Sequence, residues 1–113
     1  MTAGVVLHLT EAAAGKQRAV LRNALNLLPE VEVGTPIEVV VHGEAITLAR
    51  PGQATADALA EAQDAGITIV VCRNSLRSQD LTDRDLVHGA VVVPSGVAHL
   101  VARQLEGWAY LRP

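Results

Sequence analysis

Short apolar runs alternate with longer amphipathic segments along this chain. Four of these runs predict strands at positions 5–9, 37–41, 67–71 and 90–93, and positions 108–111 predict a short last strand. The runs are rich in β-branched residues and do not alternate strictly with polar positions, which is typical of strands buried on both faces of a sheet. The segment from Glu44 to Leu48 is ambiguous and is interpreted as an extended excursion.

The segments between the first three runs have helical periodicity and recognisable ends. The first helix is expected to end at Pro29. Its apolar face is formed by Val20, Leu21, Ala24, Leu25 and Leu28. Thr55 is a candidate N-cap for a second helix that runs to Ala65, and Gly66 suits the position that follows a helix.

Helical patterns also follow the third and fourth runs. A short helical turn is predicted over positions 73–78, and Thr82 with Asp85 resembles a capping box. Ser95 is the expected N-cap of a last helix that ends at Gly107. One face of this helix carries Val97, Leu100, Val101 and Leu105.

Strands that alternate with helices predict an α/β fold with a mainly parallel sheet. Crossover connections between parallel strands place helices on both faces of such a sheet. The sequence therefore predicts a single three-layer domain over residues 1–113, with five strands and a flavodoxin-like winding. Ligands of such sheets bind outside the carboxyl ends of the strands.

Composition narrows the classes of partner and compartment. The net charge is −3 and Lys16 is the only lysine, so no nucleic acid is expected as a partner. No apolar run approaches the roughly 20 residues of a membrane span, and no signal-peptide pattern is present at the N-terminus. The single cysteine, Cys72, allows no internal disulfide, and a cytoplasmic protein is expected.

The low proportion of charged residues predicts self-association. Charged residues make up 19% of the chain and hydrophobic residues 50%, whereas soluble domains average about 25% charged residues. Part of the outer surface is therefore expected to be covered by another subunit in a homo-oligomer.

The polar residues that end the predicted strands are the candidates for function. They are His8, His42 with Gly43, Cys72 with Asn74, and Ser95. A thiolate is the reactive form of cysteine, and a helix start after Cys72 would stabilise it, with Arg73 as an adjacent cation. The alternative is a buried, inert cysteine that completes a hydrophobic strand.

The two strand-end histidines and Ser95 each admit two interpretations. His8 and His42 could act as a base or pair with a thiolate, or they could be hydrogen-bonded histidines at the edge of the core. Together with Cys72 they match no zinc signature, so neither a metal nor a cofactor is expected. Ser95 is expected to cap its helix, whose free N–H groups could also hold an anion.

Several segments in their order and spacing resemble the DsrE-like (DsrE/DsrF-like) family over nearly the whole chain. The most telling are VVVHG after the second run, GITIVVCRNSL around the third, and VPSGV leading to GWAYL. The resemblance implies a five-stranded parallel sheet and assembly into homotrimers or homohexamers. It also implies that Cys72 carries persulfide sulfur, since the sulfur-trafficking members have a cysteine at a similar position. The VVLHL and VVVHG segments look more like a poorly characterised branch of the family.

Two functions remain open at this point. The first is a sulfur carrier or sulfurtransferase-like protein, in which Cys72 accepts sulfur from a donor protein and passes it to an acceptor in another molecule or subunit. The alternative is a non-enzymatic homo-oligomeric binding protein that holds a small anion or metabolite at the strand ends. His8, His42, Gly43, Asn74 and Ser95 are the candidate substrate-binding residues in both. A purely structural subunit is a third alternative.

Overall fold

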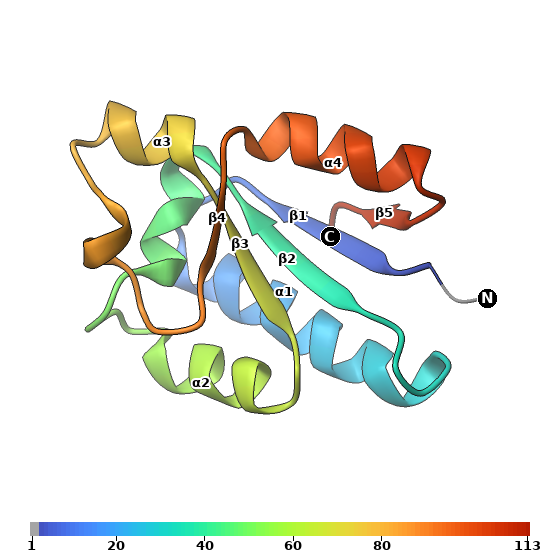
Figure 1. The fold of residues 1–113 in the computed structure, drawn as a ribbon. Coiled ribbons are helices and arrows are strands. Elements are labelled where there is room, and N and C mark those ends of the chain that lie inside the picture. Colours follow the sequence, from blue (N-terminus) through green and yellow to red (C-terminus); the bar gives the residue numbers. More distant parts are fainter. Residues whose placement is uncertain (1–2) are drawn as a thin grey trace.

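A single five-stranded sheet forms the centre of the molecule in the computed structural model, which describes residues 3–113 (Figure 1). Its strands are β1 (Val5–Leu9), β2 (Ile37–Val41), β3 (Thr68–Cys72), β4 (Val91–Val93) and β5 (Ala109–Leu111). Every neighbouring pair is parallel, in the order β4-β3-β2-β1-β5. The predicted α/β fold with a parallel sheet is confirmed. The order differs from the 2-1-3-4-5 order of flavodoxin, although helices cover both faces in each case.

The helices are divided unequally between the two faces of the sheet. They are α1 (Ala14–Leu27), α2 (Ala56–Asp64), α3 (Arg73–Ser78) and α4 (Gly96–Leu105), with 3-10 turns η1 (Leu28–Glu30), η2 (Gly43–Ala49) and η3 (Asp83–Asp85). Figure 1 shows α1 and α2 together on one face and α4 on the other. Strands β1 to β4 follow one another in one direction across the sheet, whereas β5 returns to the far side of β1. Because crossovers keep one hand, this reversal puts α4 on the opposite face.

The two faces also differ in the size of their hydrophobic cores. The larger core joins the sheet to α1, α2 and η2, and it contains the odd-numbered residues of the central strands, such as Leu7, Val39 and Ile69. The smaller core lies under α4 and consists of Val6, Val40, Val70 and Leu100, with Val93 and Trp108 packed against it. Successive strand residues point to opposite faces, so even-numbered positions of β1, β2 and β3 face α4.

Most predicted helix ends are confirmed, with one exception. Ser95 caps α4 by accepting a hydrogen bond from the Ala98 N–H at 3.1 Å. Gly66 follows α2 with φ +97°, a left-handed conformation that favours glycine. The Asp85 carboxylate accepts the Thr82 N–H in the predicted capping box, at 2.8 Å. Thr55 occupies the N-cap position of α2, but its hydroxyl is buried and makes no capping bond.

One sequence-based interpretation is wrong. Residues 44–48 are not extended but lie within η2, which buries Ala45 and Leu48 in the larger core because residues three apart share one side of a 3-10 turn. The apolar face of α4 that the sequence indicates is directed mainly outward. Only Leu100 of that face is buried, whereas Val97, Val101 and Leu105 are 54%, 51% and 84% exposed. None of the helices within residues 3–113 is both long and apolar enough to cross a membrane.

Candidate functional site

Three predicted site residues lie on one face at the carboxyl ends of adjacent strands. His8 lies in β1, His42 directly follows β2, and Cys72 is the last residue of β3. Their even-numbered positions place them on the side that faces α4. His8 is paired with Val40, so it lies two residues before the level of His42 and Cys72 along the strands. The predicted meeting of these residues at one edge of the sheet is therefore confirmed.

The Cys72 thiol lies where two helices begin. The backbone N–H groups of Asn74 and Ser75 at the start of α3 and of Gly96 at the start of α4 act as donors toward its sulfur and lower the pKa of the thiol. The Ser75 side chain is also hydrogen-bonded to it. Burial raises the pKa of the thiol, since Cys72 is only 5% exposed. The hydrogen bonds act in the other direction and together hold the pKa of Cys72 below its ordinary value.

Ser75 connects the ends of β2 and β3. The Gly43 N–H donates to the Ser75 Oγ at 2.7 Å. Because this bond uses a lone pair of the hydroxyl, the single hydroxyl proton of Ser75 remains available to the Cys72 sulfur. Gly43 has φ +63°, and this left-handed conformation accompanies the turn into η2. Gly43 thus has a positioning role through Ser75.

His8 and His42 form a hydrogen-bonded pair that continues to a third residue. The Nε2 of His8 lies 2.9 Å from the Nδ1 of His42, and the two rings are stacked. The Nδ1 of His8 lies 2.7 Å from the Tyr110 hydroxyl on β5. Burial lowers the pKa of His8, and the adjacent His42 and Arg112 lower it further. His8 is therefore predominantly neutral at neutral pH.

Gly96 packs against both His42 and Cys72. A methyl group at this position would lie 3.1 Å from the Cβ of Cys72 and 3.3 Å from the Cβ of His42. Both distances are shorter than ordinary van der Waals contact. The start of α4 therefore packs directly on both side chains, and a side chain at position 96 would force its neighbours to move by a few tenths of an ångström.

Three residues near the thiol have roles that differ from the predicted ones or match them only in part. Arg73 points to Asp83, with a two-pronged ion pair at 2.9 and 3.2 Å, so the suggested contribution of its charge to the thiol is not realised. Asn74 is exposed and contributes its backbone N–H. Ser95 caps α4 with its side chain.

A buried carboxylate near the amino end of β2 anchors α4 to the sheet. Glu38 of β2 faces α4 and is 7% exposed. Its carboxylate accepts from Arg103 at 2.8 and 3.2 Å and lies 2.7 Å from His99 Nε2. Arg103 in turn stacks over the ring of Trp108, 4.1 Å from its centroid. The sequence pattern suggested no role for His99, whereas the structure places it in this anchor.

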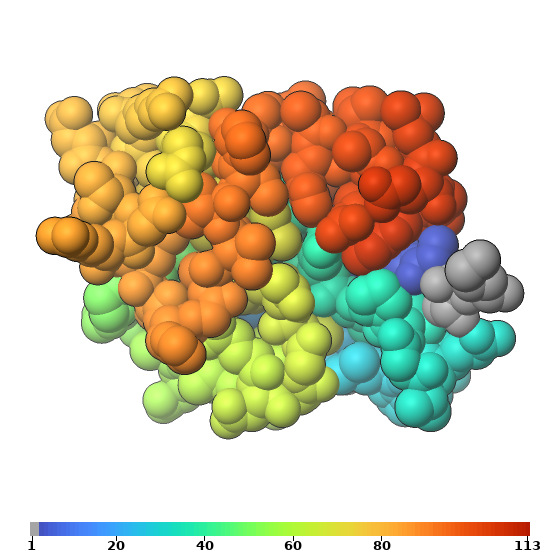
Figure 2. All heavy atoms as spheres, viewed as in Figure 1, coloured from blue at the N-terminus to red at the C-terminus, as the bar shows by residue number. Residues whose placement is uncertain are grey.

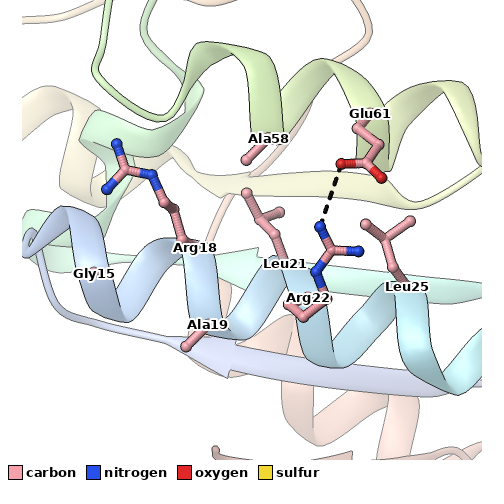
Figure 3. Close-up of a pocket in the computed structure, with 8 residues that line it drawn as sticks. All are labelled: Gly15, Arg18, Ala19, Leu21, Arg22, Leu25, Ala58 and Glu61. Atoms are coloured by element: carbon pink, nitrogen blue, oxygen red, sulfur yellow. Dashed lines mark hydrogen bonds and ion pairs between the residues drawn. The ribbon is translucent and has the colours of Figure 1, made fainter.

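An open groove of about 390 Å³ lies on the opposite face, between α1 and α2 (Figure 3). Both of its arginines already have partners. Arg22 lies 3.5 Å from the Glu61 carboxylate, and Arg18 donates to the Ala54 carbonyl at 2.9 Å. This groove lies away from the strand-end residues, and the chemistry of the molecule is concentrated at the Cys72 site.

Sequence reasoning assigned no role in the site to Tyr110 or Gly96. Tyr110 shares the even-numbered side of the sheet because it is in register with Val6 of β1. That register depends on β5 returning beside β1, which the order of elements alone does not specify. Ser75 was not among the candidate residues, although its position three residues after a strand-end cysteine was a usable signal. Within residues 3–113, no group of three His, Cys, Asp or Glu side chains is arranged to hold a metal ion.

Comparison with known proteins gives relatives of the same fold. A protein of unknown function from Methanobacterium thermoautotrophicum, MTH1491, has 35% sequence identity and a TM-score of 0.90, covering 96% of this chain and 97% of its own. The YchN protein from E. coli is 18% identical with a TM-score of 0.79 over the full length of both chains. BT1422 from Bacteroides thetaiotaomicron, of unknown function, is 16% identical with a TM-score of 0.76, covering 98% and 95%.

The family assignment is based on sequence as well as structure. No curated protein matches the sequence. The model of the DsrE/DsrF-like family matches residues 4–113, nearly the whole chain. The similarity to MTH1491 extends over the same length. The chain belongs to the DsrE/DsrF-like family.

Proposed function

We propose that this protein is a sulfur carrier that accepts sulfane sulfur on Cys72. The observation that carries the proposal is the position of Cys72 at the carboxyl end of β3 and against the start of α4, where nearby donors lower the pKa of its thiol. These donors stabilise a thiolate, the form of cysteine that attacks sulfur. The DsrE/DsrF-like family is associated in general with sulfur relay, which agrees with this chemistry.

The reaction is a thiolate exchange at a persulfide. The Cys72 thiolate attacks the outer sulfur of a donor R–S–SH, a new S–S bond forms, and the bond between the two donor sulfurs breaks. The electron pair of the broken bond leaves on the donor as R–S⁻, and Cys72 becomes a persulfide. Cys72 is the only cysteine of the chain, so the sulfur passes next to another molecule or another subunit. Because the thiol is only 5% exposed, the donor must present its persulfide on a slender group.

Mass spectrometry after exposure to glutathione persulfide tests the proposal. The expected result is a gain of one sulfur atom on the wild type and none on Cys72→Ser, which is nearly isosteric. Alkylation rate against pH should give a thiol pKa below that of a model thiol. A wild type that gains no sulfur would refute the carrier function. It would favour the alternative, a protein that binds a small anion at the same N–H groups.

We also propose that the protein acts as a homo-oligomer, a trimer or a hexamer. Val97, Val101 and Leu105 lie four residues apart on α4 and form an outward apolar stripe. The segment from β4 through α4 to β5, orange to red, forms a broad part of the surface in Figure 2. Such a stripe favours burial against another subunit, and the choice of trimer or hexamer rests on family resemblance. Light scattering should give a mass well above 11.9 kDa, and Val101→Glu should lower it; a monomeric wild type would contradict the proposal.

A further inference from the structure

The hydrogen-bonded chain from His42 through His8 to Tyr110 runs from the Cys72 site toward solvent. His42 packs beside Cys72 under Gly96. His8 is 9% exposed and bonded at both ring nitrogens, whereas Tyr110 is 37% exposed. Within residues 3–113, the Nε2 of His42 has no hydrogen-bond partner. The hydrogen-bonded chain thus begins at His42, next to Cys72, and ends at Tyr110 on the surface.

We propose that His42, His8 and Tyr110 form a proton relay between the Cys72 site and solvent. The inference rests on the proposed sulfur transfer, because that reaction releases a thiolate, R–S⁻, which takes up a proton at neutral pH since the pKa of an ordinary thiol is about 8.5. His42 is the relay residue at the site, His8 transmits the proton, and Tyr110 exchanges it with water.

The donor and acceptor roles along the hydrogen-bonded chain can be arranged in two opposite directions. A switch from one arrangement to the other moves a proton and keeps every hydrogen bond. In one direction the Tyr110 hydroxyl donates to His8 Nδ1, His8 Nε2–H donates to His42 Nδ1, and His42 Nε2 carries a proton. When His42 Nε2–H protonates R–S⁻, its Nδ1 takes the proton of His8 Nε2. The Nδ1 of His8 takes the Tyr110 proton, and water reprotonates Tyr110. Every bond is then remade in the opposite direction, and one proton has passed from water to the leaving thiol.

Burial and the neighbouring charges keep His8 in its neutral form by lowering its pKa. Four groups face His8. They are His42 directly after β2, Tyr110 in β5, Arg112 directly after β5, and Glu11 after β1. Burial lowers the pKa of His8, as do His42 and Arg112, while Glu11 opposes them. A neutral imidazole has one free lone pair and one N–H, which a relay requires.

Two variants test the relay. Tyr110→Phe removes the hydroxyl and keeps the ring, and His8→Gln keeps hydrogen-bonding ability but cannot transmit a proton. Loading from glutathione persulfide should slow by roughly tenfold or more in both, because general acid catalysis contributes about 10²–10⁴. Added imidazole buffer should restore part of the rate. Leu111→Ala, on the same strand, should load at the wild-type rate.

The same experiment distinguishes failure of the relay from failure of the carrier function. Wild-type rates in both variants, with no response to imidazole, would overturn the relay and leave sulfur loading in place. If even the wild type gains no sulfur, the carrier function fails, and ¹⁵N NMR of the imidazoles decides on the relay. Tyr110→Phe should then move the resonance of His42 Nε2, although the two residues do not touch. An unmoved resonance overturns the relay.

Discussion

Adding one methyl group at Gly96 tests how strongly the start of α4 controls the thiol. The methyl of Gly96→Ala would lie 3.1 Å from the Cβ of Cys72 and 3.3 Å from that of His42. Neither contact is with a flexible side-chain end, so α4 or the strand ends must move by a few tenths of an ångström. That movement lengthens the hydrogen bond from the residue 96 N–H to the sulfur.

The energy at stake follows from that hydrogen bond. A hydrogen bond to a charged group contributes about 1.5–3 kcal/mol, and we expect roughly half of it to be lost on lengthening. The thiolate population at neutral pH should then fall by roughly three- to tenfold, since 1.4 kcal/mol is a factor of about ten. Overpacking costs about 1 kcal/mol or more, and replacing glycine by alanine in a helix returns about 0.5–1 kcal/mol. Global stability should therefore change little while thiol reactivity falls.

Alkylation by iodoacetamide as a function of pH measures the effect. Gly15→Ala is the matched control, because no atom lies within 4 Å of the position of its new methyl group. It should stabilise α1 by about 0.5–1 kcal/mol in urea unfolding and leave the alkylation profile unchanged. An unchanged profile in Gly96→Ala would refute the argument, as would an equal change in both variants.

Four further substitutions probe the site and its support. Glu38→Gln should destabilise the protein by about 1–3 kcal/mol in urea and expose α4 amides to hydrogen exchange, because it leaves Arg103 and His99 of α4 without their carboxylate partner; unchanged exchange would contradict the anchor. Ser75→Ala removes a hydroxyl that serves both the thiol and a turn amide, so alkylation at neutral pH should slow, and an equal rate would exclude this bond. Arg73→Gln should leave the alkylation profile unaltered because the arginine is paired with Asp83, and a slower reaction would restore its suggested electrostatic role. Because the pKa of His8 is lowered in the folded protein, the unfolded chain binds a proton first as the pH falls, and the wild type should lose stability below about pH 6.5, the ordinary pKa of histidine. His8→Gln should reduce this loss when urea midpoints are plotted against pH, and parallel plots for the variant and the wild type would contradict the prediction.

The strands and their parallel arrangement could be predicted because their apolar runs are short, β-branched and separated by helix signals. The position of Cys72 between a strand and a helix start followed from the same pattern. The topological rule for strand ends then brought His8 and His42 to the same edge. These inferences need only local sequence and chain connectivity, which are the levels at which sequence patterns are informative.

The orientation of α4 could not be predicted from apolar spacing. Residues 96, 99, 100 and 103 face the sheet, and two of them are the polar partners of Glu38. A pattern that assigns apolar residues to the core therefore selected the outer side of this helix. The charged residue in the middle of β2 was the available signal, since a buried carboxylate requires partners.

The unequal helix coverage explains why the polar residues gather on the face of the sheet that carries α4. An α-helix with its side chains is about 10 Å wide, which is about the width of two strands spaced roughly 4.8 Å apart. The five-stranded sheet is therefore only partly covered on the α4 face, whereas α1, α2 and η2 together cover the other. Even-numbered positions near the uncovered margins can hold polar groups without full desolvation, and His8 and Tyr110 occupy such positions beside β5. The reversal that sends β5 to the far side of β1 thus creates both the contact between α4 and the thiol and the polar path that leads away from it.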